Sequence, residues 1–173
     1  MHNLIQYFDL DLANRPMLVS VLNGKNPGIV LVDSDNPSLC IVRNNAGWTF
    51  ISKSVNENLF QSSVNAILNY GEVKLVWKGN SRVIHPRPNN IIDRLEFRDH
   101  IFDSQLLMSI KDGLPRKFQI VPIDARLLKN CMWHEKIISV CGTEENFIKN
   151  GVGFCITKQS EIVAEGYAPF FGD

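Results

Sequence analysis

The last third of the sequence restricts the possible folds more than any other part, because it predicts a β-hairpin directly after a helix. Two runs rich in β-branched and aromatic residues, 152–158 and 162–168, flank the polar triplet 159–161. Runs of this kind joined by so short a segment predict an antiparallel hairpin. Gly151, just before the first run, suits a helix end with a positive φ. Ahead of the hairpin the sequence predicts a strand over 118–123 and helical segments over 125–132, 133–140 and 144–149, the first and last of these helices capped by Asp124 and Thr143.

The first half of the sequence predicts a second set of strands that follow one another along the chain. Three short β-prone runs, 29–33, 39–43 and 48–52, are separated by clusters of Asn, Asp, Ser and Gly. Such clusters favour tight turns. We therefore expect an antiparallel meander, followed by a further strand over 73–77.

One helix is predicted before this meander in the sequence, and another is predicted after it. One covers 16–22, and Gly24 with the following Asn-Pro-Gly segment ends it. The other runs from Asn56 or Asn58 to Asn69 and ends near Gly71. Its apolar residues recur at the three- and four-residue spacing of a single buried face. The residues expected on that face are Leu59, Phe60, Val64, Ile67 and Leu68.

The segment 113–116 is the candidate boundary between two units, since a Gly and a Pro separate a polar stretch from a fresh strand. We expect an N-terminal α/β subdomain over 1–115 and a second unit over 116–173. Within the first unit, 79–90 contains two prolines and predicts a loop, and 95–102 predicts a strand. The predicted fold class is α+β, with mixed, mainly antiparallel sheets and flanking helices.

Composition excludes several functional classes. The sequence contains 18 Lys and Arg residues and 18 Asp and Glu residues, so its formal net charge is zero and no general field attracts nucleic acid or an anionic membrane. No apolar run approaches the roughly 20 residues that span a bilayer. We therefore expect a cytoplasmic protein without nucleic-acid or membrane partners. The four cysteines lie in apolar stretches without paired spacing, which predicts reduced, buried thiols.

One locally basic region could contact phosphates. It carries Arg82, His85, Arg87, Arg94 and Arg98. Acidic residues alternate with these side chains, and the loop offers no aromatic platform on which bases could stack. The pattern is more typical of a solvated surface with ion pairs than of a nucleic-acid groove.

Several stretches of the chain resemble the bacterial GNAT-type acetyltransferases of the long, two-part kind. The stretch 146–156 (NFIKNGVGFCI) resembles a helix end that runs into a Gly-Phe-Gly-Phe-Cys-like strand of that family, and 161–165 (EIVAE) resembles its return strand. The stretch 133–139 (WHEKIIS) precedes them. The stretch 21–33 (VLNGKNPGIVLVD) resembles the family's N-terminal region.

The resemblance implies an N-terminal α/β subdomain, the first elements of an acetyltransferase domain and acetyl-CoA as the family's acyl donor. In such enzymes, successive backbone amides in a turn like Arg or Gln-x-x-Gly-x-Gly or Ala hold the pyrophosphate. This sequence contains no such turn. We therefore expect the N-terminal portion or a short homologue of the enzyme, which alone neither binds acetyl-CoA nor transfers acetyl groups. The alternatives are an enzyme completed by a partner chain or a domain-swapped dimer, and a protein-binding module without catalysis.

The resemblance also indicates two candidate catalytic residues, Glu165 and Tyr167, which lie on the return strand at the acceptor side. Alternate residues of a strand point to the same face, so the two side chains lie together. Acyl transfer to an amine needs a group that removes a proton. A Glu and a Tyr on a strand are most often a solvated edge residue and a half-buried packing residue.

A zinc site is a further possibility, because Cys131 and His134 form a Cys-x-x-His pair and Cys141 follows. Structural zinc takes four ligands, and the only candidate for the fourth is Cys155, which lies among apolar residues. Buried thiols explain this pattern better than a metal does. The same burial argues against a nucleophilic cysteine, which requires an electropositive, partly exposed position.

The aromatic residues are of two kinds. Those scattered singly through the predicted elements are expected in the core: Phe8, Trp48, Phe50, Phe60, Trp77, Phe97, Phe118 and Phe154. The terminal run from Tyr167 to Phe171 is different, because it would form an exposed apolar edge of the sheet. An edge of this kind pairs readily with another chain, so self-association or a protein partner is expected there.

Overall fold

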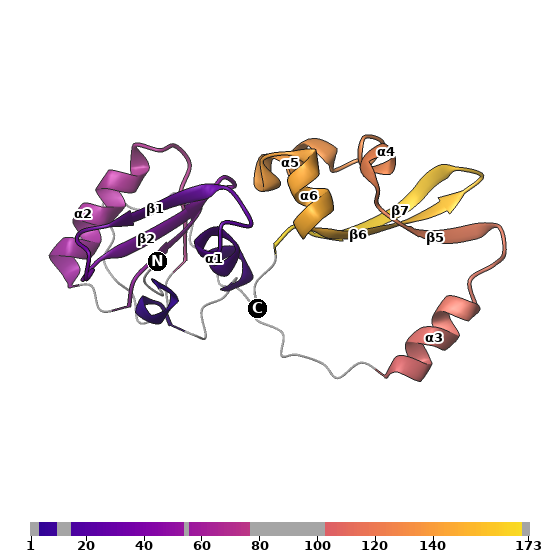
Figure 1. The fold of residues 1–173 in the computed structure, drawn as a ribbon, viewed down its shortest axis with the longest axis horizontal. Coiled ribbons are helices and arrows are strands. Elements are labelled where there is room, and N and C mark those ends of the chain that lie inside the picture. The colour runs from indigo at the N-terminus through magenta and orange to yellow at the C-terminus, as the bar shows by residue number, and fades with distance from the viewer. Residues whose placement is uncertain (1–3, 10–14, 54–55, 77–102, 171–173) are drawn as a thin grey trace.

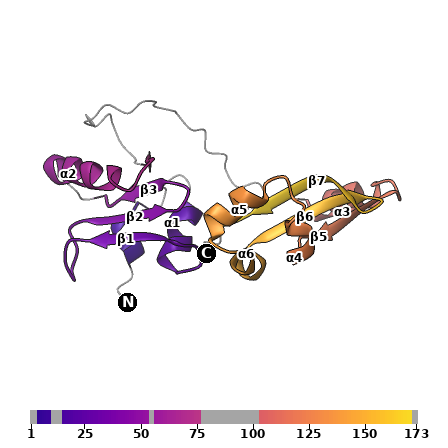
Figure 2. The same ribbon diagram turned by 90° about the horizontal axis from the view of Figure 1, so that it is seen from above.

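The computed structural model describes residues 4–9, 15–53, 56–76 and 103–170, and these form two sheets that lie side by side with their own helices (Figure 1). Figure 2 shows the same arrangement from above, with α1 on the side of the first sheet that faces α5 and α6. The predicted α+β class with mainly antiparallel sheets is confirmed. The predicted boundary near residue 115 remains a prediction.

The first sheet contains four strands in the order β1-β2-β3-β4. Strands β1 (Gly28–Val32), β2 (Cys40–Asn44) and β3 (Trp48–Ile51) pair in antiparallel fashion, which confirms the meander. Strand β4 (Lys74–Val76) lies parallel to β3, because helix α2 (Glu57–Leu68) connects them across the sheet. A parallel neighbour requires a crossover of this kind.

Helices cover both faces of the first sheet. Helix α1 (Arg15–Leu22) and the 3-10 helix η1 (Leu4–Tyr7) pack against Cys40 and Val42 of β2. Helix α2 packs against the opposite face, which Ile41 presents. Side chains of a strand alternate between faces, so β2 contributes to both core clusters. This burial on both sides explains why the consecutive residues Cys40, Ile41 and Val42 of β2 are all apolar.

Helix α2 begins as predicted, since the Asn56 side chain accepts a hydrogen bond from the Leu59 amide. Phe60, Val64 and Ile67 are buried against the sheet. The prediction was wrong for Leu68, which is 40% exposed. It is the last residue of the helix and lies at the margin of the apolar stripe.

The second sheet contains three antiparallel strands in the order β5-β6-β7. Strand β5 (Phe118–Pro122) comes first, and β6 (Val152–Lys158) and β7 (Glu161–Ala168) form the predicted hairpin. Gln159 and Ser160 both have positive φ, as a two-residue hairpin turn requires.

Three helices connect β5 to β6 and cover one face of this sheet (Figure 1): α4 (Ala125–Leu128), α5 (His134–Cys141) and α6 (Glu144–Asn150). Asp124 and Thr143 cap α4 and α6 as predicted. The core beneath the helices contains Leu128, Ile137 and Phe147.

The backbone at Gly151 differs from the prediction of a positive φ. Its φ is −87° and its ψ is 162°, so the chain passes from α6 into β6 in an extended conformation. The need for glycine is steric. A Cβ atom there would overlap the Phe147 ring and lie 2.6 Å from the Phe147 carbonyl oxygen.

The predicted aromatic core is confirmed only in part. Phe8, Phe50 and Phe60 are buried, but Phe154 is 50% exposed. Phe154 points to the face of the second sheet opposite the helices, because its neighbour Cys155 takes the buried face. Trp48 and Phe118 are half-buried, and Trp77 and Phe97 lie outside the described residues.

Helix α3 (Ser104–Asp112), ahead of β5, was not predicted. The Asp103 carboxylate caps it by accepting hydrogen bonds from the amides of Gln105 and Leu106. Every residue of α3 is exposed, so no buried face distinguished it from a polar stretch. The predicted loop over 79–90 lies outside the described residues, as does the strand predicted over 95–102. No helix in the described ranges is long and apolar enough to cross a membrane.

Candidate functional site

The candidate site lies where β7 packs against the helices of the second sheet. Glu165 and Tyr167 are both half-buried and lie on the same face of β7, as their spacing predicts. Tyr167 packs against the core cluster that contains Ile137 and Cys141. The structure therefore brings the two predicted residues together on the inner face of the sheet.

Glu165 is held by the two residues that directly precede α5. Its two carboxylate oxygens accept hydrogen bonds from the backbone amides of Met132 and Trp133, at 3.0 and 3.1 Å. A carboxylate at this position also interacts favourably with the helix dipole. Each oxygen retains a second lone pair that can accept a further proton donor. Sequence reasoning missed this contact, because its donors are main-chain groups more than thirty residues away.

Burial raises the pKa of the Tyr167 hydroxyl above its ordinary value, and the negative charge of Glu165 adds to this effect. A raised pKa keeps the phenol protonated at neutral pH. Tyr167 can therefore donate a proton or a hydrogen bond. It is poorly suited to act as a base.

The four residues of the possible zinc site do not converge. The Sγ atoms of Cys131 and Cys155 lie 3.9 Å apart, but His134 contacts Glu144 at 3.0 Å and Cys141 contacts the Pro169 carbonyl oxygen. Across the described part of the chain, no three His, Cys, Asp or Glu residues lie together as metal ligands would.

The prediction of free, buried thiols is confirmed for all four cysteines. Burial raises the pKa of Cys131 to about 12, and hydrogen bonding to Cys155 adds to the effect. Burial also raises the pKa of Cys40 and Cys141 to about 11 each. Thiols of this kind are protonated and inert at neutral pH.

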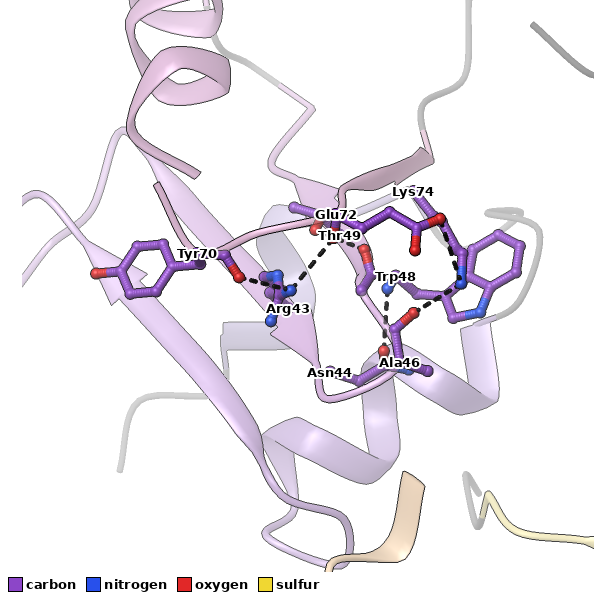
Figure 3. Close-up of polar contacts among 9 residues, drawn as sticks. Arg43, Asn44, Ala46, Trp48, Thr49, Tyr70, Glu72 and Lys74 are labelled. Atoms are coloured by element: carbon purple, nitrogen blue, oxygen red, sulfur yellow. Dashed lines mark hydrogen bonds and ion pairs between the residues drawn. The ribbon is translucent and has the colours of Figure 1, made fainter. Parts of the chain in front are cut away.

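A second polar cluster, in the first sheet, holds β4 against β3 (Figure 3). The Arg43 guanidinium donates hydrogen bonds to the carbonyl oxygens of Tyr70 and Glu72, at 3.0 and 3.2 Å. Lys74 donates to the Ala46 carbonyl oxygen at 3.0 Å, and Asn44 accepts from the Trp48 amide. These side chains satisfy backbone groups of the crossover and of the turn between β2 and β3, which indicates a structural role.

Some predicted residues cannot be placed. The basic residues Arg82, His85, Arg87, Arg94 and Arg98 lie outside the described ranges, as does Phe171.

Tyr167, Pro169 and Phe170 are half-buried rather than exposed, because Tyr167 and Phe170 pack against the core of the second sheet. Among the large hydrophobic side chains of β7, the exposed one is Val163, at 50%.

Two comparisons with known proteins give matches. The family model for GNAT acetyltransferase matches residues 9–171. Among solved structures, the chain is similar to a GCN5-related N-acetyltransferase-like protein from Streptococcus suis 89/1591, with a TM-score of 0.54 and 17% sequence identity. The similarity covers 92% of this chain and 66% of that chain, so this chain spans a little less than two thirds of its length. A search of curated proteins finds no match.

The paired sheets and their helices define a two-part α+β protein of acyltransferase-like fold. The family match extends over nearly the whole described structure. The chain therefore belongs to the GNAT acetyltransferase family.

Proposed function

We propose that these 173 residues form the scaffold of a bacterial-type, cytoplasmic GNAT acetyltransferase, corresponding to the enzyme's N-terminal portion, and that alone they neither bind acetyl-CoA nor transfer acetyl groups. Members of this family take the acetyl group from acetyl-CoA. The donor-binding turn would then come from polypeptide outside these residues. The sequence itself contains no turn of the pyrophosphate-binding type.

The observation that supports this proposal is that side chains of the protein already accept hydrogen bonds from backbone amides at the helix starts. A pyrophosphate binds to free amides at a helix N-terminus. In the helices α2, α3, α4 and α6, a side chain of this chain already accepts hydrogen bonds from one or two of those amides. The capping residues are, in order, Asn56, Asp103, Asp124 and Thr143. Directly ahead of α5, Glu165 accepts hydrogen bonds from the amides of Met132 and Trp133. Asp103, Asp124 and Glu165 are carboxylates, which would also repel a phosphate. These five positions therefore fit the pyrophosphate of acetyl-CoA poorly.

Within the completed enzyme, Glu165 and Tyr167 would act on the acceptor's protons. The Glu165 carboxylate has lone pairs left to accept a proton, and its position is fixed by two amides. Tyr167 stands two residues further along the same face and is protonated at neutral pH. These properties suit an acceptor and a donor of protons, respectively.

Calorimetric titration of acetyl-CoA into the isolated chain tests the proposal. We expect no saturable heat, because the sequence contains no pyrophosphate-binding turn and side chains already cap the starts of α2, α3, α4 and α6. An acetyltransferase of known affinity, titrated under the same conditions, shows that binding would be detected. Saturable binding with a micromolar dissociation constant would refute the proposal.

A second candidate is an enzyme completed in trans, and the position of β7 favours it. Strand β7 is the outer strand of the second sheet as described, so one side of its backbone has no strand partner there. Such an edge can pair with a strand of another chain. We expect the main-chain edge of β7, rather than the half-buried side chains of Tyr167 and Phe170, to mediate self-association, which light scattering measures as a mass that rises toward twice that of the chain with concentration. A constant monomer mass would exclude the domain-swapped form of this candidate.

A further inference from the structure

The loop between α1 and β1 reaches into the second part of the molecule through a buried amide. Asn26, on this loop, is only 5% exposed. Its Nδ2 atom lies 3.1 Å from the carbonyl oxygen of Pro169 and 3.5 Å from that of Val140. The Cys141 Sγ atom lies 3.7 Å away. One side chain of the first part thus contacts both the end of α5 and the residue that follows β7 by one position.

A second amide makes the contact reciprocal. Asn146 of α6 donates from Nδ2 to the carbonyl oxygens of Lys25 and Cys141, each at 2.7 Å. Its own Oδ1 accepts a hydrogen bond from Asn150 at 2.7 Å, which fixes the orientation of the amide. Neighbouring residues of one loop, Lys25 and Asn26, are therefore bound by the helices of the second part.

Apolar contacts surround these hydrogen bonds. Pro27 lies so close to Gly142 that a Cβ atom on Gly142 would be 3.0 Å from the proline ring. Ala46 packs against the core of the second sheet, and Lys74 holds its carbonyl oxygen (Figure 3). Hydrogen bonds sheltered from water in this way are stronger than exposed ones.

We propose that Asn26 is a positioning residue, which fixes the course of the chain at the end of β7 and thereby the strand that carries Glu165 and Tyr167. An amide nitrogen has two protons, so Asn26 can satisfy the Pro169 and Val140 carbonyl oxygens together. The importance of this contact for catalysis rests on the proposed function, whereas its effect on the position of the β7 end is independent of that function.

The Asn26→Asp substitution tests this role with almost no change in shape. The carboxylate cannot donate, and it faces two carbonyl oxygens and a thiol, so the contact becomes repulsive. The matched control is Asn23→Asp, which introduces the same charge at an exposed position near the same loop. Hydrogen exchange of the full chain, measured by segment, gives the readout without acetyl-CoA and is therefore independent of the proposed function.

We expect Asn26→Asp to speed exchange of the β6-bonded amides near the end of β7 by about tenfold or more, as loss of one hydrogen bond implies. Exchange in β2 and in β5 should change by less than about twofold, as for a surface substitution. The Asn23→Asp control should leave all segments within that limit. Unchanged exchange at the end of β7, or equal acceleration in every segment, would overturn the proposal. If Asn26→Asp does not fold, Asn26→Ala gives the same readout and is judged by the same outcomes.

Discussion

Replacing Phe147 by alanine should lower the free energy of unfolding by about 3–5 kcal/mol, the range for removing a buried aromatic ring. Phe147 is 1% exposed and lies in the core of the second sheet. Its ring covers the backbone of Gly151 and Gly153, where a Cβ atom would collide with it or with its neighbour Ile123. The cavity cannot be filled from those positions, because glycine has no side chain to move inward. Urea denaturation measures the loss.

The control for this substitution is Ile148→Ala. Ile148 is the next residue of α6 and is 41% exposed, so its truncation should cost about 1 kcal/mol or less. Equal losses for the two variants would show that Phe147 does not hold the helices to the sheet.

Raising the pH from 9 to 10 should destabilise the fold by about 3 kcal/mol through its buried thiols. Cys131, with a pKa of about 12, and Cys40 and Cys141, each with a pKa of about 11, stay protonated in the folded chain, whereas in the unfolded chain they ionise near 9.0. The unfolded state therefore binds fewer protons, and stability falls as pH rises. Each such thiol contributes about 1 kcal/mol over this interval, because it is already half ionised in the unfolded chain at pH 9.

Urea denaturation under reducing conditions at several pH values measures this fall. The Cys141→Ala variant should show a shallower slope above pH 9, because one of the three thiols is gone. At pH 7 the same variant should lose only the stability that its packing supplied. An identical slope in both proteins would show that the thiols are not responsible.

Local sequence patterns predicted most of the fold. The hairpin and the meander could be predicted because strand runs and turn residues alternate over a few positions. The helix starts could be predicted from the capping residues Asn56, Asp124 and Thr143. Helix α3 was missed because it buries nothing, although Asp103 is a cap of the same type. The Gly151 backbone was predicted incorrectly because glycine is needed there to avoid a steric clash with Phe147, not to allow a positive φ in a turn.

The site was less accessible to sequence reasoning. The spacing of Glu165 and Tyr167 placed them on one face, but the amides that hold Glu165 belong to a segment whose proximity depends on tertiary packing. Asn26 precedes Pro27 in an Asn-Pro-Gly segment whose sequence is typical of a turn. Its partners at Val140 and Pro169 are more than a hundred residues away, and no local pattern encodes such contacts.

The most direct test of the account is an NMR titration of the labelled chain with acetyl-CoA, observed at the backbone amides of the helix starts. We expect the amides of Met132 and Trp133, and those that donate to the caps of α2, α3, α4 and α6, to keep their positions as acetyl-CoA is added, since side chains of the protein already accept their hydrogen bonds. Saturable shifts that cluster at any one of these helix starts would contradict it.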